Sequence, residues 1–495
     1  MGLMKDIIDE FIFNNYLDFD KKIKIHHKRT IHELLIGMIT SRSVLLTEIA
    51  RKLKIKGTIK HIHKRLDRNL KELELGELEE KLIYQNAAAI EEMDLCILDM
   101  SDIAKPYASK MEYLGTVHDG SAKKEVSGFP MMGIVSINPS EKSKQFPVAN
   151  YLKIFSRKAP GYMSDNDEIE KAISAISANK QQRLTWVIDR GGDSNAIFNM
   201  ILRQEDNFII RMDTGLSSRG IILDSKHEEW NISQLDFSKL SKTTGSHITI
   251  EKLLPCVKYL PEQVKLTGKI EKNDEIEKKY SFECAFFYVK LPGIEKKFLD
   301  RTFGLYIFND KKYKTPIGII STILPEEKQI LANMKKIIHS YVYRWVIEEY
   351  FRFLKQSFDL ENIRILTYQR MQNMIKLLFF VSTILWKISF KTEYSIWKKH
   401  IAAVIEYAKP SLKTIKSENF IGYAMVTGLA NLFSRNPLLL YRFGFLPLRV
   451  DSFDNKKRQN KEEQLFLIKP KQCKIFSHYG YSHVRRKKYA LYIGA

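Results

Sequence analysis

Two short apolar segments of the chain each lead into an aspartate. Residues 95–98 precede Asp99, and residues 184–188 precede Asp189. Sites in α/β sheets gather at the carboxyl ends of strands, so the two carboxylates are expected to lie side by side. Two adjacent carboxylates repel each other, and a hard cation such as Mg²⁺, which prefers carboxylate oxygen, would relieve that repulsion. An aspartate after a strand is also a common turn or capping residue, so neither is diagnostic alone.

A third acid lies in a segment with helical periodicity. At about 100° per residue, Tyr341, Arg344, Glu348 and Lys355 fall on one stripe roughly 60° wide. Glu349 points about 100° away from Glu348. One helix face would therefore present a carboxylate beside an aromatic hydroxyl and two cations. The alternative is a solvated face on which Arg344 and Glu348 form an ordinary i,i+4 ion pair.

The charge of the chain indicates a polyanionic partner. Lys and Arg number 80 against 58 Asp and Glu, a net charge of +22 over 495 residues. The surplus is concentrated in residues 21–70 and 455–495. Phosphates attract such surfaces and release counterions on binding, so nucleic acid is the favoured partner, and a merely basic surface is the alternative.

The remaining composition indicates a cytoplasmic protein without membrane spans. Residues 377–386 form the most apolar run, which is far shorter than the roughly 20 residues of a spanning helix, so a buried core helix is expected. The N-terminus carries charges among its apolar residues, which argues against a signal peptide. Four well-separated cysteines indicate neither a disulfide framework nor a zinc module, and they fit a reducing compartment: Cys96, Cys256, Cys284 and Cys473.

The helical N-terminal segment is a candidate DNA-binding module. Apolar residues recur at helical spacing within residues 30–53, and a break containing Gly57 follows. Thr58 is placed to cap a second, basic helix. Helix, short turn and basic helix form the outline of a helix-turn-helix motif. The side chains expected to contact DNA are Lys60, Lys64 and Arg65.

Five segments follow from these patterns. Residues 1–90 form the helical DNA-binding domain. Strands alternate with helices over residues 91–240, which indicates the first part of an α/β core. Residues 241–312 read as a β-rich insertion. Residues 313–400 return to the core and carry the Glu348 helix, and residues 401–495 form a helical, basic C-terminal region.

The pattern Tyr-x2-Arg-x3-Glu-x6-Lys resembles the signature of the insertion-sequence-four family of bacterial DDE transposases, at Tyr341, Arg344, Glu348 and Lys355. The segment Asp99-Met100-Ser101-Asp102 resembles the first-Asp block of that family, and Asp189-Arg190-Gly191-Gly192-Asp193 resembles its second. The motifs occur in the family's order and span roughly residues 94–390.

The resemblance implies an RNase H-like core in which Asp99, Asp189 and Glu348 hold two magnesium ions, with manganese as a substitute. Arg344 and Lys355 would grip DNA phosphates, and Tyr341 would hydrogen-bond one. Arg190 would reach DNA or pair with a core acid. Some relatives carry a base-stacking Trp in the insertion, but residues 316–324 contain none.

The resemblance also implies the biological activity. A homodimer would bind terminal inverted repeats, cleave DNA at both ends and join the ends to target DNA, beside the nucleoid of a bacterial or archaeal cytoplasm. The C-terminal region would contribute to dimerisation. Two alternatives stay open: a catalytically inactive DNA-binding protein derived from a transposase, and an RNase H-like nuclease without strand transfer.

Overall fold

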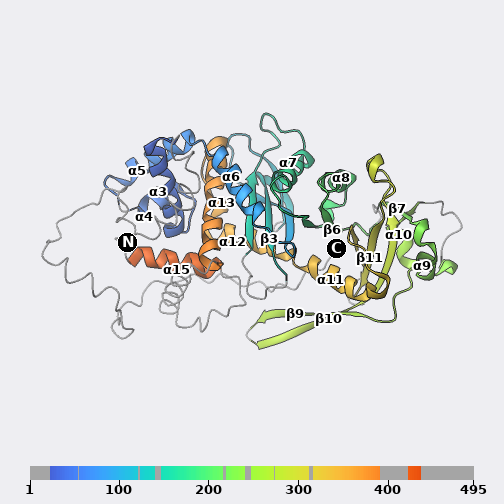
Figure 1. Cartoon of the computed structure of the whole chain (residues 1–495). Helices are drawn as coiled ribbons and strands as arrows, with labels where there is room; N and C mark the ends of the chain where they lie inside the picture. Colours follow the sequence, from blue (N-terminus) through green and yellow to red (C-terminus); the bar gives the residue numbers. More distant parts are fainter. Residues whose placement is uncertain are drawn as a thin grey trace.

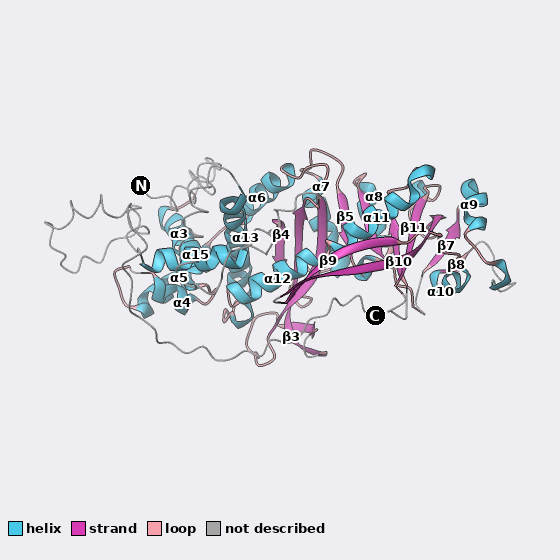
Figure 2. Cartoon of the chain, turned by 90° about the horizontal axis from the view of Figure 1, so that it is seen from below, coloured by secondary structure: helices cyan, strands magenta, loops and turns pink. Residues whose placement is uncertain are grey.

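Three regions follow one another along the molecule: a helical bundle, a sheet flanked by helices, and a β-rich region (Figure 1). The same order is seen from below (Figure 2). The computed structural model describes residues 23–53, 55–120, 123–139, 147–215, 219–239, 247–272, 274–310, 316–390 and 422–435. The predicted helical, basic C-terminal region therefore lies outside the described residues, apart from one helix.

The N-terminal bundle contains four described helices: α3 (Ile25–Ser41), α4 (Leu46–Lys52), α5 (Ile59–Glu72) and α6 (Gly76–Ala88). The side chain of Thr58 accepts a hydrogen bond from the His61 backbone N–H, so the expected cap of α5 is present. Helix α3 is buried along most of its length and contacts both α13 (Tyr368–Phe390) and α15 (Gly422–Arg435). The bundle thus packs around helices from the far end of the chain.

The centre of the molecule is a mixed sheet. Strands β1, β5 and β6 run parallel, whereas β3 lies antiparallel between β1 and β4. Helix α13 contacts β4, and α11 (Ile330–Val342) contacts β5 and β6. The elements of this part are β1 (Leu95–Ala104), β2 (Gly115–Asp119), β3 (Lys124–Ile137), β4 (Val148–Ile154), α7 (Asp165–Ser177), β5 (Thr185–Ile188), α8 (Asn195–Arg203) and β6 (Asn207–Arg211).

The β-rich region continues the same sheet. Strand β12 (Ile317–Ser321) joins β6 to β11, so the strand order runs β2-β3-β1-β5-β6-β12-β11-β10-β7-β8. The region also holds short helices, where the sequence offered few helical signals, because segments of four to six residues are too short to display a period. Its elements are β7 (Gly220–Leu223), α9 (Glu228–Ser233), β8 (Ile248–Thr249), α10 (Ile250–Leu253), β9 (Val264–Lys272), β10 (Asp274–Lys290) and β11 (Phe303–Asn309).

The helices after the sheet correct one expectation. The single helix predicted through residues 341–355 is two helices, α11 and α12 (Trp345–Ser357). The chain turns at Tyr343 and Arg344, where the backbone N–H groups of both residues bond to carbonyls three residues back. This tight turn needs neither proline nor glycine, so the apolar periodicity did not reveal it.

Helix α13 confirms the predicted buried core helix, since the apolar side chains between Leu377 and Leu385 are at most 3% exposed. No helix of the described chain is long and apolar enough to cross a membrane.

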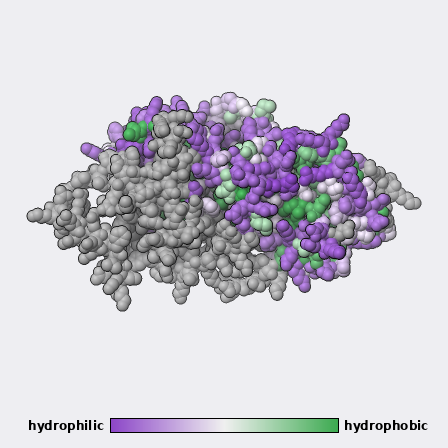
Figure 3. All heavy atoms as spheres, viewed as in Figure 1, coloured by the Kyte–Doolittle hydropathy of each residue, from purple (hydrophilic) through white to green (hydrophobic). Residues whose placement is uncertain are grey.

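The face seen in Figure 3 is largely hydrophilic where it is described, with hydrophobic side chains in small patches. The described 3₁₀ turns are Arg190–Gly192, Ser225–His227, Phe237–Lys239, Leu254–Cys256, Lys296–Phe298, Glu327–Gln329 and Leu360–Asn362.

Candidate active site

The parallel pairing of β1 and β5 brings the two aspartates together. The last registered pair is Leu98 with Ile188, and the next residue on each strand is Asp99 or Asp189. Strand β1 does not end at Asp99, as the sequence suggested, but continues to Ala104 along β3. Only its pairing with β5 ends there. The two carboxylates therefore lie where neighbouring strands separate, which leaves room for a ligand.

Glu348 reaches the same place from helix α12. Ile347 and Phe351 of this helix are buried against the sheet, close to Gly133 of β3. Gly133 is the register partner of Asp99. A Cβ at Gly133 would lie only 2.8 Å from Cε1 of Phe351, so the close approach of α12 depends on this glycine. The packing thus places Glu348 beside Asp99.

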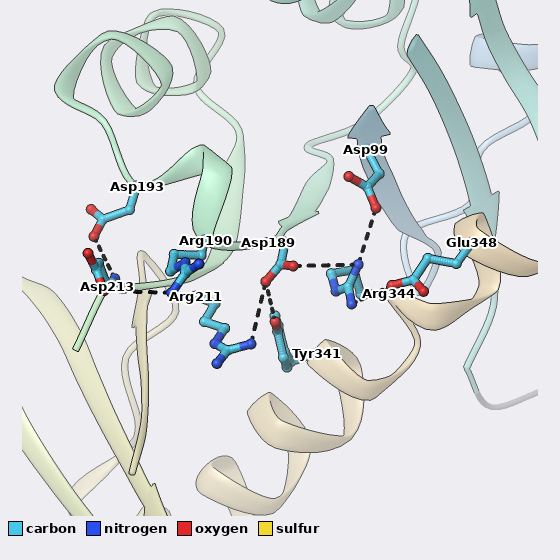
Figure 4. Close-up of polar contacts among 9 residues, drawn as sticks. All are labelled: Asp99, Asp189, Arg190, Asp193, Arg211, Asp213, Tyr341, Arg344 and Glu348. Carbon is cyan, nitrogen blue, oxygen red and sulfur yellow. Dashed lines mark hydrogen bonds and ion pairs between the residues drawn. The ribbon is translucent and has the colours of Figure 1, made fainter. Parts of the chain in front are cut away.

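Arg344 connects all three acids (Figure 4). Its Nη1 lies 3.2 Å from Oδ2 of Asp99 and 3.8 Å from Oδ2 of Asp189, and its Nη2 lies 2.6 Å from Oε1 of Glu348. The Arg344 side chain is 13% exposed, so these interactions are only weakly screened by solvent. One guanidinium therefore offsets the repulsion among three carboxylates.

Two further side chains hold Asp189 (Figure 4). The Tyr341 hydroxyl donates a 2.8 Å hydrogen bond to Oδ1 of Asp189. Arg211, at the end of β6, places Nη1 3.9 Å from the same oxygen. Sequence reasoning missed Arg211, because only the parallel pairing of β5 with β6 brings it to this edge.

The two aspartates have opposite pKa shifts. Burial is the largest influence on Asp99, and it raises the pKa of that carboxyl to about 6 despite the nearby Arg344. Burial also opposes ionisation of Asp189, yet Arg344 and the Tyr341 hydroxyl outweigh it and lower the pKa of Asp189 below its ordinary value. Of the two aspartates, Asp99 therefore gains a proton first as the pH falls.

Lys355 and Arg190 lie beside this centre. Lys355 lies about two turns of α12 beyond Glu348. Its Nζ is 3.1 Å from Oε1 of Glu361 and 3.9 Å from Oδ2 of Asp102. Arg190 is 52% exposed, with Nη1 4.0 Å from Oδ1 of Asp213. It helps to line an open pocket of about 680 Å³, together with Gly191, Asp193, Asp213 and Arg219.

The predicted DNA contacts of α5 differ from one another in the structure. Lys60 and Lys64 are exposed. Arg65 turns inward, and its Nη1 lies 2.6 Å from Oε2 of Glu33, which is fully buried on α3. Arg29 pairs with the other oxygen of Glu33 at 2.9 Å. Arg65 therefore joins α5 to α3, while Lys60 and Lys64 face solvent.

The three acids suit a hard divalent cation. Carboxylate oxygens are the protein ligands that Mg²⁺ and Mn²⁺ prefer, whereas softer metals select nitrogen and sulfur. The side chains of Asp99, Asp189 and Glu348 are 25%, 35% and 31% exposed, so their oxygens remain accessible. By ligand type the three acids therefore suit magnesium, while in the structure Arg344 lies between them and their oxygens do not all come within 4.8 Å of one another.

Trp345 lies next to Arg344 and was not among the predicted site residues. It begins α12 and is 39% exposed, so part of its ring is accessible. The guanidinium of Arg352 lies 5.9 Å from the ring centroid. Its position in the motif, between Arg344 and Glu348, was the available signal.

None of the curated proteins matches the chain. Among solved structures, a piggyBac transposase synaptic complex with hairpin DNA has a TM-score of 0.36 and 8% identity, covering 93% of this chain and 86% of that chain. A similarity that low supports no conclusion about activity.

A family model described as a transposase DDE domain matches residues 157–384. The matched segment contains Asp189 and Glu348 and begins after Asp99, which pairing with β5 brings to the same edge. The chain is therefore similar to transposase DDE domains over a segment that includes two of the three gathered acids.

Proposed function

We propose that this protein is the transposase of an insertion sequence and uses Asp99, Asp189 and Glu348 to cleave and rejoin DNA. The observation that carries the proposal is the gathering of the three carboxylates around Arg344, from β1, β5 and α12. The matched transposase DDE domain supports it. So does the strand order β4-β3-β1-β5-β6, with only β3 reversed, which is the arrangement of an RNase H-like core.

The three carboxylates would bind two magnesium ions, for which manganese can substitute. When bound, the ions would activate the attacking oxygen and stabilise the leaving oxygen of the phosphodiester. The contribution of the protein is positioning. Asp189 is fixed by Tyr341 and Arg211, Asp99 by its pairing with β3, and Glu348 by the packing of α12. Such preorganisation lowers the barrier because the groups need not rearrange during reaction.

Cations around the site would receive DNA phosphates. Arg344 presents a planar guanidinium, which matches phosphate geometry. Lys355 lies further along α12, and the exposed Arg190 directly follows Asp189. Because the Tyr341 hydroxyl already donates to Asp189, we assign it to positioning that acid rather than to binding a phosphate.

Trp345 would contact a base close to the scissile bond. An exposed aromatic ring beside a nuclease site offers a stacking surface to an unpaired base, whatever its identity. The ring lies one residue from Arg344 and three from Glu348, within reach of the DNA that these residues would hold.

The N-terminal bundle would bind the terminal repeats. Lys60, Lys64, Arg68 and Lys71 are exposed on α5, and at about 100° per residue they fall within one stripe roughly 80° wide. A helix face with four exposed cations, bordered by Asp67, which pairs with Arg370, suits the DNA backbone and groove. We also propose that the protein acts as a homodimer, in the cytoplasm, on the DNA of the nucleoid.

The test is an assay with purified protein and DNA that carries the sequences flanking the reading frame. With Mg²⁺ or Mn²⁺, cleavage at both ends is expected, and pre-cleaved ends should join to a second DNA. Specific binding without any nicking would support the inactive DNA-binding alternative. Cleavage without joining of pre-cleaved ends would support the nuclease alternative.

A further inference from the structure

Two histidines at the start of α3 and a glutamate at the end of α5 form a compact cluster outside the proposed active site. One ligand atom from each of His26, His27 and Glu72 lies within 4.8 Å of the others. The histidine rings are 4.3 Å apart between centroids, in an edge-to-face arrangement. Glu72 Oε2 lies 3.7 Å from Nε2 of His27. The cluster thus joins two helices that are distant in sequence.

His27 provides a second, independent indication of a ligand. The residue is only 9% exposed, and its buried Nε2 has no partner within hydrogen-bond distance. At 3.7 Å, the Glu72 oxygen is beyond hydrogen-bond distance from that nitrogen. A buried polar atom without a partner is costly. A metal ion bound to the nitrogen would remove that cost.

We propose that His26, His27 and Glu72 bind one Zn²⁺ ion, with water completing the coordination. Two imidazoles and a carboxylate are a ligand set that zinc accepts and magnesium does not favour. Zinc–nitrogen bonds of about 2.0–2.1 Å require ligand atoms about 3.3 Å apart in a tetrahedron. His26 and Glu72 are both exposed, so their side chains can close the remaining gap.

The ion would fasten the C-terminal end of the basic helix α5 to α3. Glu72 is the last residue of α5, and the dipole of that helix favours a cation at its C-terminal end. The dipole of α3, which begins at this point, and the charge of Lys24 disfavour a cation there. At the middle of α5, the Arg65–Glu33 ion pair already joins the same two helices. Zinc would therefore fix the direction of the stripe that carries Lys64 and Arg68. The metal site itself does not depend on the proposed function.

The experiment uses the full chain with D99N, D189N and E348Q, so that the other acids do not capture metal. After removal of metal with EDTA, Zn²⁺ is titrated calorimetrically and Co²⁺ by visible absorption, both in excess Mg²⁺. One equivalent should bind, with the intense absorption of low-coordinate cobalt. His27→Ala, and separately Glu72→Gln, should weaken binding at least about tenfold.

Glu72→Gln keeps the test valid if the buried His27 variant misfolds, because Glu72 is exposed. The matched controls are His61→Ala and His63→Ala. These histidines lie on α5, as Glu72 does, but outside the cluster, so both variants should bind Zn²⁺ as the unchanged protein does. Absence of saturable binding in excess Mg²⁺ would overturn the proposal. So would binding that Glu72→Gln leaves unchanged, or that His61→Ala weakens equally.

Discussion

The substitution Gly133→Ala tests whether the packing of α12 sets the geometry of the acids. The new Cβ would lie 2.8 Å and 2.9 Å from two ring carbons of Phe351. Carbon atoms in ordinary contact are about 3.5–4.0 Å apart, so the ring and its helix must retreat by about 0.7 Å. The backbone on the other side belongs to β3, held between β1 and β4, and it gives way less easily.

The expected cost has two parts. Overpacking of this kind destabilises a core by about 1–3 kcal/mol, which denaturant unfolding would register. A misplacement of about 1 Å in a catalytic group costs on the order of 100-fold in rate, so cleavage should slow by about 10- to 100-fold. Metal-dependent single-turnover cleavage of DNA ends measures that loss, with end binding measured separately and expected to persist.

A matched control and a rescue accompany this variant. Gly220→Ala changes another strand glycine, at which a Cβ meets no atom within 4 Å, so it should leave stability and rate unchanged. Phe351→Leu in the Gly133→Ala background shortens the clashing side chain and should restore most of the rate. Wild-type cleavage and stability in Gly133→Ala, or equal damage from Gly220→Ala, would refute the packing argument.

Three further predictions concern separate parts of the molecule. Trp345→Ala should weaken binding of end DNA by about 1–3 kcal/mol, as for loss of one stacked base, and equal binding by both proteins in a gel-shift titration would contradict the stacking role. Asp206 is fully buried and accepts hydrogen bonds from Ser177, Lys180, the Leu184 N–H and Trp186, so Asp206→Ala should cost about 3–5 kcal/mol in denaturant unfolding. An unchanged unfolding midpoint would argue against that network. Burial raises the pKa of Asp99 to about 6, so protons should compete with Mn²⁺ for this carboxylate, and Mn²⁺ binding should weaken progressively below about pH 6. With the ordinary aspartate pKa of about 4, the weakening would begin only below about pH 4. Calorimetric affinities that stay constant from about pH 7 to pH 5 would be inconsistent with the buried Asp99.

Local patterns in the sequence predicted the elements of the site. An apolar run before each aspartate predicted β1 and β5. The spacing from Tyr341 to Lys355 predicted a shared helical face, although α11 carries Tyr341 and α12 carries Glu348 and Lys355. These features could be predicted because strand and helix periods are properties of adjacent residues. The end of a strand pairing is not such a property, so the continuation of β1 to Ala104 along β3 was not foreseen.

Features set by tertiary packing were not predictable from the sequence. Arg65 belongs to a basic helix, yet the buried Glu33 of another helix draws it inward. Arg211 reaches Asp189 only because β5 and β6 pair in parallel. The β-rich insertion was predicted as a segment, but its continuation of the core sheet depends on the pairing of β12 with β6.

The central claim is that Glu348 acts with Asp99 and Asp189 in metal-dependent DNA cleavage. Its most direct test compares Glu348→Gln with Glu349→Gln in a single-turnover cleavage assay on end DNA. Glu349 is the adjacent acid, but it pairs with Arg352 and accepts a hydrogen bond from Tyr423, away from Arg344. We expect Glu348→Gln to bind the ends and fail to cleave them, while Glu349→Gln cleaves as the wild type does. Cleavage by Glu348→Gln at the wild-type rate would contradict the account.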